Sequence, residues 1–128
     1  MNLGARADAH IHLFKRGYQG DSLRQQRGVS VDEVLFYQSL MQDHQIQSAL
    51  VVGFAGKSWC AENNDFLAKL VPRCLWIHAL AYWEIKLNKD PLELLETWQI
   101  QGFKGISLYV FEELDSRSLS GISDKVWD

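Results

Sequence analysis

A short, mostly apolar stretch near the N-terminus, residues 7–14, has the sequence ADAHIHLF. Its composition predicts a buried β-strand over residues 7–13. Because successive side chains of a strand point to opposite faces, His10 and His12 are expected to share one face of this strand. Two imidazoles one strand repeat apart can reach a single metal ion, and neutral imidazole is a common ligand of zinc. The spacing therefore predicts a pair of metal ligands.

Asp8 continues the same alternation one step back, so it is expected on the histidine face. There it would contact the ion or hold the ring of a ligand in position. The alternative is a chance match, or two polar residues on a half-exposed strand. Context favours the metal site, because a loop rich in glycine and charge follows and then strands alternate with helices. In α/β barrels the chemistry lies at that end of the strands.

The rest of the chain alternates between apolar runs and capped, amphipathic segments. Further strands are expected at residues 48–54, 74–81 and 105–110, and helices at about residues 30–44, 59–71 and 91–101, with the first turn of another after residue 123. Continuous apolar runs are typical of parallel strands buried on both faces. The alternation predicts an α/β fold with a parallel sheet, in strand order 1-2-3-4 and with the helices on one face.

Two of the expected helices begin with recognisable capping residues. Ser30 and Glu33 fit a capping box, in which each side chain satisfies a backbone N–H group of the first turn. Asp90 and Pro91 suit the N-cap and first helical position of the last helix. A closed (β/α)8 barrel needs about 250 residues. We therefore expect residues 1–128 to form a single partial domain, the first four β/α units and hence the N-terminal half of a TIM-like barrel.

Composition narrows the classes of function. The chain is 47% hydrophobic and 23% charged, with a formal net charge of −3. The sequence contains no run of basic residues, so nucleic acid is not favoured as a partner. Neither a signal peptide nor an apolar run long enough to span a bilayer is visible. Cys60 and Cys74 lack a CxxC spacing and are expected to be two reduced thiols. These features predict a cytoplasmic protein without a membrane partner.

The pattern Asp-Ala-His-Ile-His resembles the Asp-x-His-x-His signature that opens the amidohydrolase superfamily, and within it the amidohydrolase-related (amidohydrolase 2) branch. Residues 64–67 (NDFL) and 102–106 (GFKGI) are similar to that group's second helix and to the turn into its fourth strand. The resemblance covers nearly the whole chain but only the first half of the family's barrel. It implies a metal-dependent hydrolase in which His10 and His12 bind a divalent ion, zinc or alternatively manganese.

The resemblance also implies a mechanism. The ion would activate a water that attacks a carbonyl carbon of a C–N bond or of a C–O ester or lactone bond. The remaining ligands and the general base belong to later strands of the family's barrel, so the site is expected to be incomplete in this chain. Lys104 precedes the fourth strand and Glu112 follows it too late to bridge two ions, which favours a single ion. The family motif places no ligand at His78, which is expected to be a packed, hydrogen-bonded core residue.

A small-molecule substrate is expected to contact the loops that follow the strands. The candidates, each with surface exposure or packing as the alternative, are Arg16, Tyr18, Lys57 and Trp59, with Tyr82 and Trp83. Cationic side chains suit a carboxylate or lactone oxygen, and aromatic ones suit a ring.

Other functions stay open at this point. One is non-oxidative decarboxylation of an aromatic or unsaturated acid, which the same branch performs. Phosphatases and nucleases that also open with His-x-His are less favoured, because the loop after residue 110 is acidic. The last is a non-catalytic half-barrel, acting as an interaction module, as a homo-oligomer, or as a unit completed by the missing C-terminal half.

Overall fold

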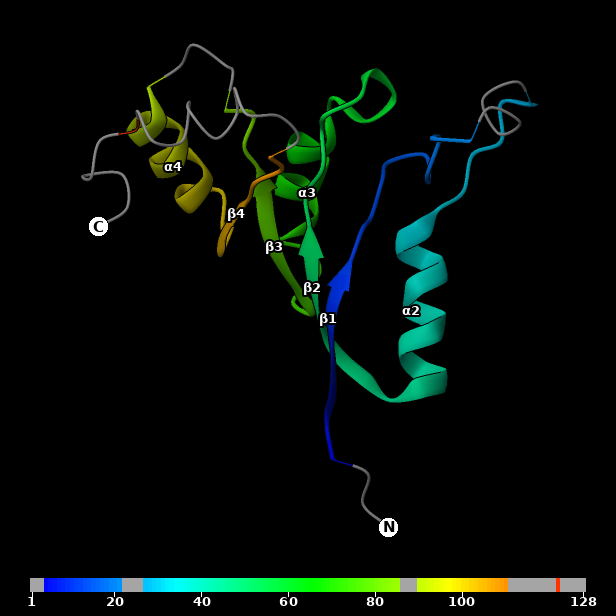
Figure 1. The fold of residues 1–128 in the computed structure, drawn as a ribbon. Helices are drawn as coiled ribbons and strands as arrows, with labels where there is room; N and C mark the ends of the chain where they lie inside the picture. Colours follow the sequence, from blue (N-terminus) through cyan, green and yellow to red (C-terminus); the bar gives the residue numbers. More distant parts are fainter. Residues whose placement is uncertain (1–3, 22–26, 86–89, 111–121, 123–128) are drawn as a thin grey trace.

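The computed structural model describes residues 4–21, 27–85, 90–110 and 122. Along the chain (Figure 1) the elements are β1 (Arg6–Ile11), α2 (Glu33–His44), β2 (Ile46–Val52), the 3-10 turn η1 (Ser58–Cys60), α3 (Asn63–Leu70), β3 (Ile77–Tyr82), α4 (Pro91–Ile100) and β4 (Gly105–Ser107). The acidic loop and the helix expected after residue 123 lie outside the described residues. Among the described helices, none is long and apolar enough to cross a membrane.

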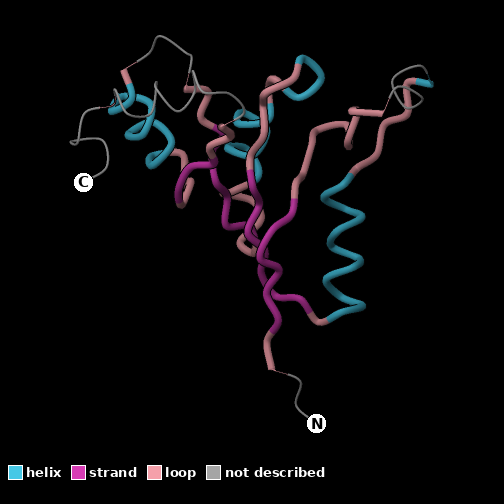
Figure 2. Tube along the Cα trace, in the orientation of Figure 1, coloured by secondary structure: helices cyan, strands magenta, loops and turns pink. Residues whose placement is uncertain are grey.

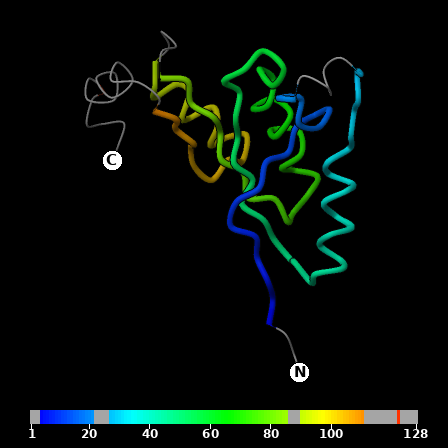
Figure 3. Tube along the Cα trace, turned by 45° about the vertical axis from the view of Figure 1, so that its right-hand side comes forward, coloured from blue at the N-terminus to red at the C-terminus, as the bar shows by residue number. Residues whose placement is uncertain are grey.

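The strands form one parallel sheet in the order β1-β2-β3-β4, as the sequence predicts. Figure 2 shows the strands gathered at the centre with helices around them, and Figure 3 shows from a second direction that β1 runs beside β2. The α/β class with parallel β/α units is therefore confirmed, and the arrangement is that of half a TIM-like barrel.

The core lies between the sheet and the helices. Alternate residues of β2 and β3 are almost fully buried there, and they pack against Tyr37 of α2 and Leu67 of α3; the strand residues are Ala49, Val51, Ile77, Ala79 and Ala81. The helices thus cover one face of the sheet, as expected. The opposite face carries the intervening side chains, which are more exposed, so burial on both faces does not hold within the described chain.

His78 corrects one expectation directly. Its side chain is exposed, whereas its neighbours in β3, Ile77 and Ala79, are buried. Since strand side chains alternate, His78 points away from the helices to the open face of the sheet. The prediction of a packed core histidine is therefore wrong, because the apolar run around it does not reveal which face each residue takes.

A β-bulge in β1 corrects a second expectation. Asp8 pairs with Ala49 and Ile11 pairs with Val51, so three steps along β1 match two along β2. Paired residues of neighbouring strands point to the same face, and Ala49 and Val51 face the helices. Asp8 therefore also faces the helices, and its predicted place on the histidine face is wrong. The strict alternation behind that prediction fails because a bulge inserts one extra residue.

The helix boundaries are close to the predictions, with one cap misassigned. In α4, Asp90 is the N-cap and Pro91 the first residue, as predicted. In α2 the N-cap is Asp32, whose carboxylate accepts a hydrogen bond from Leu35 N at 3.0 Å. The predicted capping box of Ser30 is therefore wrong, since Asp32 supplies the better placed acceptor.

The remaining differences are a second strand that begins two residues earlier than predicted, shorter first, third and fourth strands, and a broken second helix. The segment predicted as one helix over residues 59–71 contains η1 followed by α3. Cys60 and Cys74 are free, and burial raises the pKa of the Cys60 thiol. These details leave the predicted order of elements intact.

Candidate active site

The two histidines of the opening strand converge. His10 Nε2 lies 3.2 Å from His12 Nε2, and the ring planes meet at 73° with their centroids 4.9 Å apart. Two nitrogens bound to one tetrahedral zinc ion, each about 2.0–2.1 Å from the metal, are separated by roughly 3.3 Å. The spacing of the two Nε2 atoms therefore fits a shared divalent ion.

A backbone carbonyl orients His12 for this role. His12 Nδ1 lies 2.7 Å from Val52 O at the end of β2. A carbonyl can only accept, so Nδ1 carries the proton and Nε2 is left with its lone pair. Metal-binding histidines typically donate their second ring N–H in this way. The end of β2 thus fixes the His12 ring so that Nε2 is the nitrogen that could bind a metal ion.

Asp8 contacts the histidine strand from the helix side of the sheet. Its Oδ2 accepts a hydrogen bond from Tyr37 OH at 3.0 Å, and its Oδ1 accepts a longer one of 3.4 Å from His10 N. Burial, together with this carboxylate, raises the pKa of Tyr37 to about 12, so its hydroxyl stays protonated and donates. Within the described ranges no three His, Cys, Asp or Glu side chains are grouped closely enough to hold a metal ion. Asp8 therefore acts on the backbone of the histidine strand.

A pocket of about 560 Å³ opens beside His12 at the carboxyl ends of the strands. Its described lining is His12, Phe14, Tyr18, Gly20, Phe54, Lys57, Trp59 and Tyr109. Three of the four main substrate candidates thus come together with a candidate ligand. Arg16 instead borders a separate small crevice, which shares Phe14 and Trp59 with this pocket, and Trp83 is buried.

Aromatic rings wall this pocket on both sides. On one side Trp59 contacts Phe14 and Tyr18 edge to face, with centroids 4.8 and 5.1 Å apart. On the other, Phe54 contacts Tyr109 in the same manner at 5.0 Å, and burial raises the pKa of the Tyr109 phenol. Phe14, Phe54 and Tyr109 escaped the sequence prediction. All three lie within three residues after a strand in the structure, but only Phe14 followed an expected strand, because the second and fourth strands were expected to include Phe54 and Tyr109.

Lys57 brings a positive charge to the aromatic pocket. Its side chain is exposed, and its carbonyl oxygen accepts a hydrogen bond from Cys60 N at 3.1 Å. The backbone of Lys57 is thereby held by the η1 turn, and its exposed side chain contributes to the lining of the pocket. A lysine there can attract the carboxylate of a ligand whose apolar part lies between the rings.

Two asparagines at the start of α3 hold the strand ends together. The buried Asn63 donates from Nδ2 to Leu13 O at 2.8 Å and accepts from Phe54 N at 3.0 Å. Asn64, part of the NDFL segment, forms two 2.8 Å hydrogen bonds with the backbone of Tyr82. The first turn of α3 therefore fixes the ends of β1, β2 and β3, where the pocket begins.

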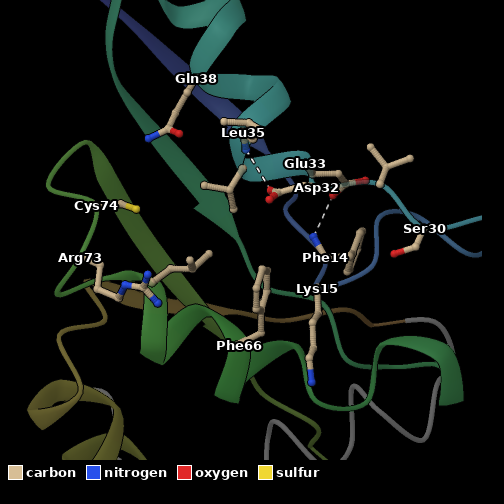
Figure 4. Close-up of a pocket in the computed structure, with 13 residues that line it drawn as sticks. Phe14, Lys15, Ser30, Asp32, Glu33, Leu35, Gln38, Phe66, Arg73 and Cys74 are labelled. Atoms are coloured by element: carbon tan, nitrogen blue, oxygen red, sulfur yellow. Dashed lines mark hydrogen bonds between the residues drawn. The ribbon is translucent and has the colours of Figure 1, made fainter.

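Glu33 fixes the loop that carries Phe14 and Tyr18. Its carboxylate accepts hydrogen bonds from Phe14 N and Tyr18 N, both at 2.8 Å. Figure 4 shows the first of these bonds reaching from the start of α2 to the loop. Glu33 thus holds two walls of the pocket through their backbones, instead of closing a capping box.

A second cavity, of about 480 Å³, lies on the helix side between α2 and α3 (Figure 4). Its acidic side chains are already engaged, because Asp32 caps α2 and Glu33 accepts from the loop. Neither His10 nor His12 belongs to its described lining. The pocket beside His12 is therefore the better candidate for a site of chemistry.

Comparison with models of known protein families gives no match, and comparison with curated protein sequences gives none either. Among solved structures, the chain is similar to a probable 2-pyrone-4,6-dicarboxylic acid hydrolase from Acinetobacter baumannii, solved with citric acid bound. The match has a TM-score of 0.56 and 16% identity, and it covers 89% of this chain and 44% of the other. The chain thus spans less than half of the solved protein. At this identity the likeness establishes the fold, parallel β/α units of a TIM-like barrel.

Proposed function

We propose that this chain carries the histidine pair of the metal centre of a hydrolase of the amidohydrolase-related type. The observation that carries the proposal is the 3.2 Å approach of His10 Nε2 to His12 Nε2, with His12 Nδ1 held by Val52 O. The location at the carboxyl ends of parallel strands, where barrel enzymes keep their chemistry, supports the same conclusion. The name of the structural neighbour, a hydrolase, supports this class of reaction.

The residues of the site have separate roles in the proposed reaction. When bound, a divalent ion, zinc or manganese, supplies Lewis-acid chemistry by lowering the pKa of a water and polarising a carbonyl oxygen. His10 and His12 would hold the ion, and the hydrogen bond to Val52 O orients His12 for it in advance. Lys57 attracts a carboxylate, and Trp59 with its neighbours holds a ring. The proposed substrate is therefore a small cyclic acid, ester or lactone.

The first test is zinc binding by isothermal titration calorimetry. We expect one weak site per chain, since two imidazoles are fewer than the three or so protein ligands of a catalytic zinc site. His10→Ala and His12→Ala should each weaken binding at least tenfold, and the double variant should abolish it. His44→Ala is the matched control, because this exposed histidine ends α2 far along the chain from the pair.

The outcomes separate the possible functions. Zinc binding that survives in the double His10→Ala/His12→Ala variant would place the site elsewhere and refute the proposal. Turnover of aromatic esters and lactones with added Zn²⁺ or Mn²⁺ is the second measurement, and product analysis distinguishes hydrolysis from loss of CO₂. Zinc binding without turnover would favour a half-barrel that works only when completed by further strands.

A further inference from the structure

The bulge in β1 is held from the helix layer. It lies between Asp8 and Ile11, the stretch that includes His10. Bulges next to active sites commonly re-aim a side chain, because the extra residue bends the strand and increases its twist. The direction of the His10 imidazole therefore depends on what holds the bulge in place.

Tyr37 and Asp8 form the hydrogen bonds that connect the bulge to the helix layer. Tyr37 is only 8% exposed and belongs to α2, on the far side of the strand from the imidazoles. Its hydroxyl donates to Asp8 Oδ2, and the other carboxylate oxygen accepts from His10 N. A carboxylate beside the apolar core needs such partners, since an unpaired polar group there is costly. One side chain thus connects a helix to the backbone of a candidate ligand.

We propose that Tyr37 is a positioning residue, which acts through Asp8 to hold the bulge of β1 so that His10 Nε2 converges on His12 Nε2. The inference rests on the proposed metal site. It assigns Tyr37 no contact with ion or substrate. Without the hydroxyl, Asp8 loses the partner that keeps it against the helix, its bond to His10 N weakens, and His10 samples directions away from His12.

Tyr37→Phe is the decisive variant, because it removes the hydroxyl and keeps the ring, which packs 5.5 Å from the ring of Trp76. Leu40→Val is the matched control, since Leu40 lies on the same helix and packs against the same core. Both changes reduce stability, but only Tyr37→Phe breaks the link to Asp8. Asp8→Asn should retain most of the wild-type behaviour, because its amide oxygen can still accept from His10 N while its NH2 group can donate to the hydroxyl oxygen of Tyr37.

Two measurements are made on each variant. Amide hydrogen exchange, followed by NMR, should be at least fivefold faster at His10 in Tyr37→Phe than in Leu40→Val. Zinc affinity should fall about tenfold in Tyr37→Phe, the usual loss when a partner behind a ligand is removed, and stay within twofold in Leu40→Val.

Equal behaviour of Tyr37→Phe and Leu40→Val in His10 exchange would overturn the inference. If the wild-type chain binds no zinc, the proposed function fails, and the exchange rates alone still decide whether Tyr37 holds the bulge. The two failures are therefore distinguishable.

Discussion

At the scale of single residues, three described carboxylates in the first half of the chain accept hydrogen bonds from backbone N–H groups. Asp32 caps α2, Glu33 accepts from two N–H groups of the loop after β1, and Asp8 accepts from His10 N. Hydrogen bonds to a charged acceptor are stronger than those between neutral groups. Asp8 and Glu33 thus shape the strand and the loop around the candidate site, and Asp32 fixes the start of α2.

Replacing Glu33 with alanine should destabilise the fold. Two backbone N–H groups lose a charged acceptor, and the expected cost is about 1–3 kcal/mol in the free energy of unfolding. Urea denaturation followed by tryptophan fluorescence measures it. Because Trp59 contacts Phe14 and Tyr18, its emission should also change in the native state.

Glu93→Ala is the control for this prediction. Glu93 is an exposed acidic residue in the first turn of α4, so its loss should change stability by no more than about 0.5 kcal/mol. A Glu33→Ala chain as stable as Glu93→Ala would mean that the loop does not depend on this carboxylate.

At the scale of elements, α3 sets the geometry of the pocket floor. It begins with Asn63 and Asn64, whose amides bind the backbone at the ends of three strands. A parallel sheet leaves backbone groups unpaired where its strands end, and buried groups of this kind need partners. The start of α3 therefore supplies hydrogen-bond partners for backbone groups at the ends of β1, β2 and β3, and in this way it ties the three strand ends together.

Asn63→Asp tests this arrangement. The new carboxylate can still accept from Phe54 N, but it cannot donate to Leu13 O and would face that oxygen with a negative charge. Since Asn63 is 2% exposed, the variant should lose about 1–3 kcal/mol in the free energy of unfolding at neutral pH. Thermal denaturation monitored by circular dichroism gives the measurement.

Asp65→Asn, on the exposed side of the same helix, serves as the comparison and should change little. The Asn63→Asp chain should recover part of its stability at low pH, where the carboxyl group becomes protonated and regains a donor. Equal stability of both variants at neutral pH would rule out the proposed role of Asn63.

At the scale of the whole molecule, the described chain leaves apolar surface on both flanks of the sheet. Beside β1, Leu35 and Phe36 of α2 are 65% and 62% exposed, and Ile100 at the end of α4 is 87% exposed. The side chains on the face of the sheet opposite the helices are also more exposed than those on the helix side. Exposed apolar patches and open sheet edges favour association with another chain or segment.

We therefore predict that the 128-residue chain self-associates. Size-exclusion chromatography with light scattering should show a mass that rises with concentration. Leu35→Lys combined with Phe36→Lys should shift the distribution toward monomer, because charge opposes burial of the α2 flank. A monodisperse monomer across the whole concentration range would contradict the prediction.

The order of strands and helices, the parallel sheet and the pairing of His10 with His12 followed from the sequence alone. Hydrophobic periodicity and capping residues are local patterns, so the elements that they indicate can be predicted without the tertiary structure. The His-x-His spacing worked because the two residues are close neighbours in the chain, with His10 in β1 and His12 directly after its last residue, Ile11. The metal role of the two histidines, by contrast, stays a prediction.

Only the tertiary structure decided which groups meet across the chain. Asp8 changed face because the register between β1 and β2 contains a bulge, and His78 was exposed because the helices cover only the other face of β3. The aromatic pocket likewise joins residues from three separate loops. Such contacts depend on register and on how loops close over the sheet, and neither quantity is encoded in the periodicity of a single segment.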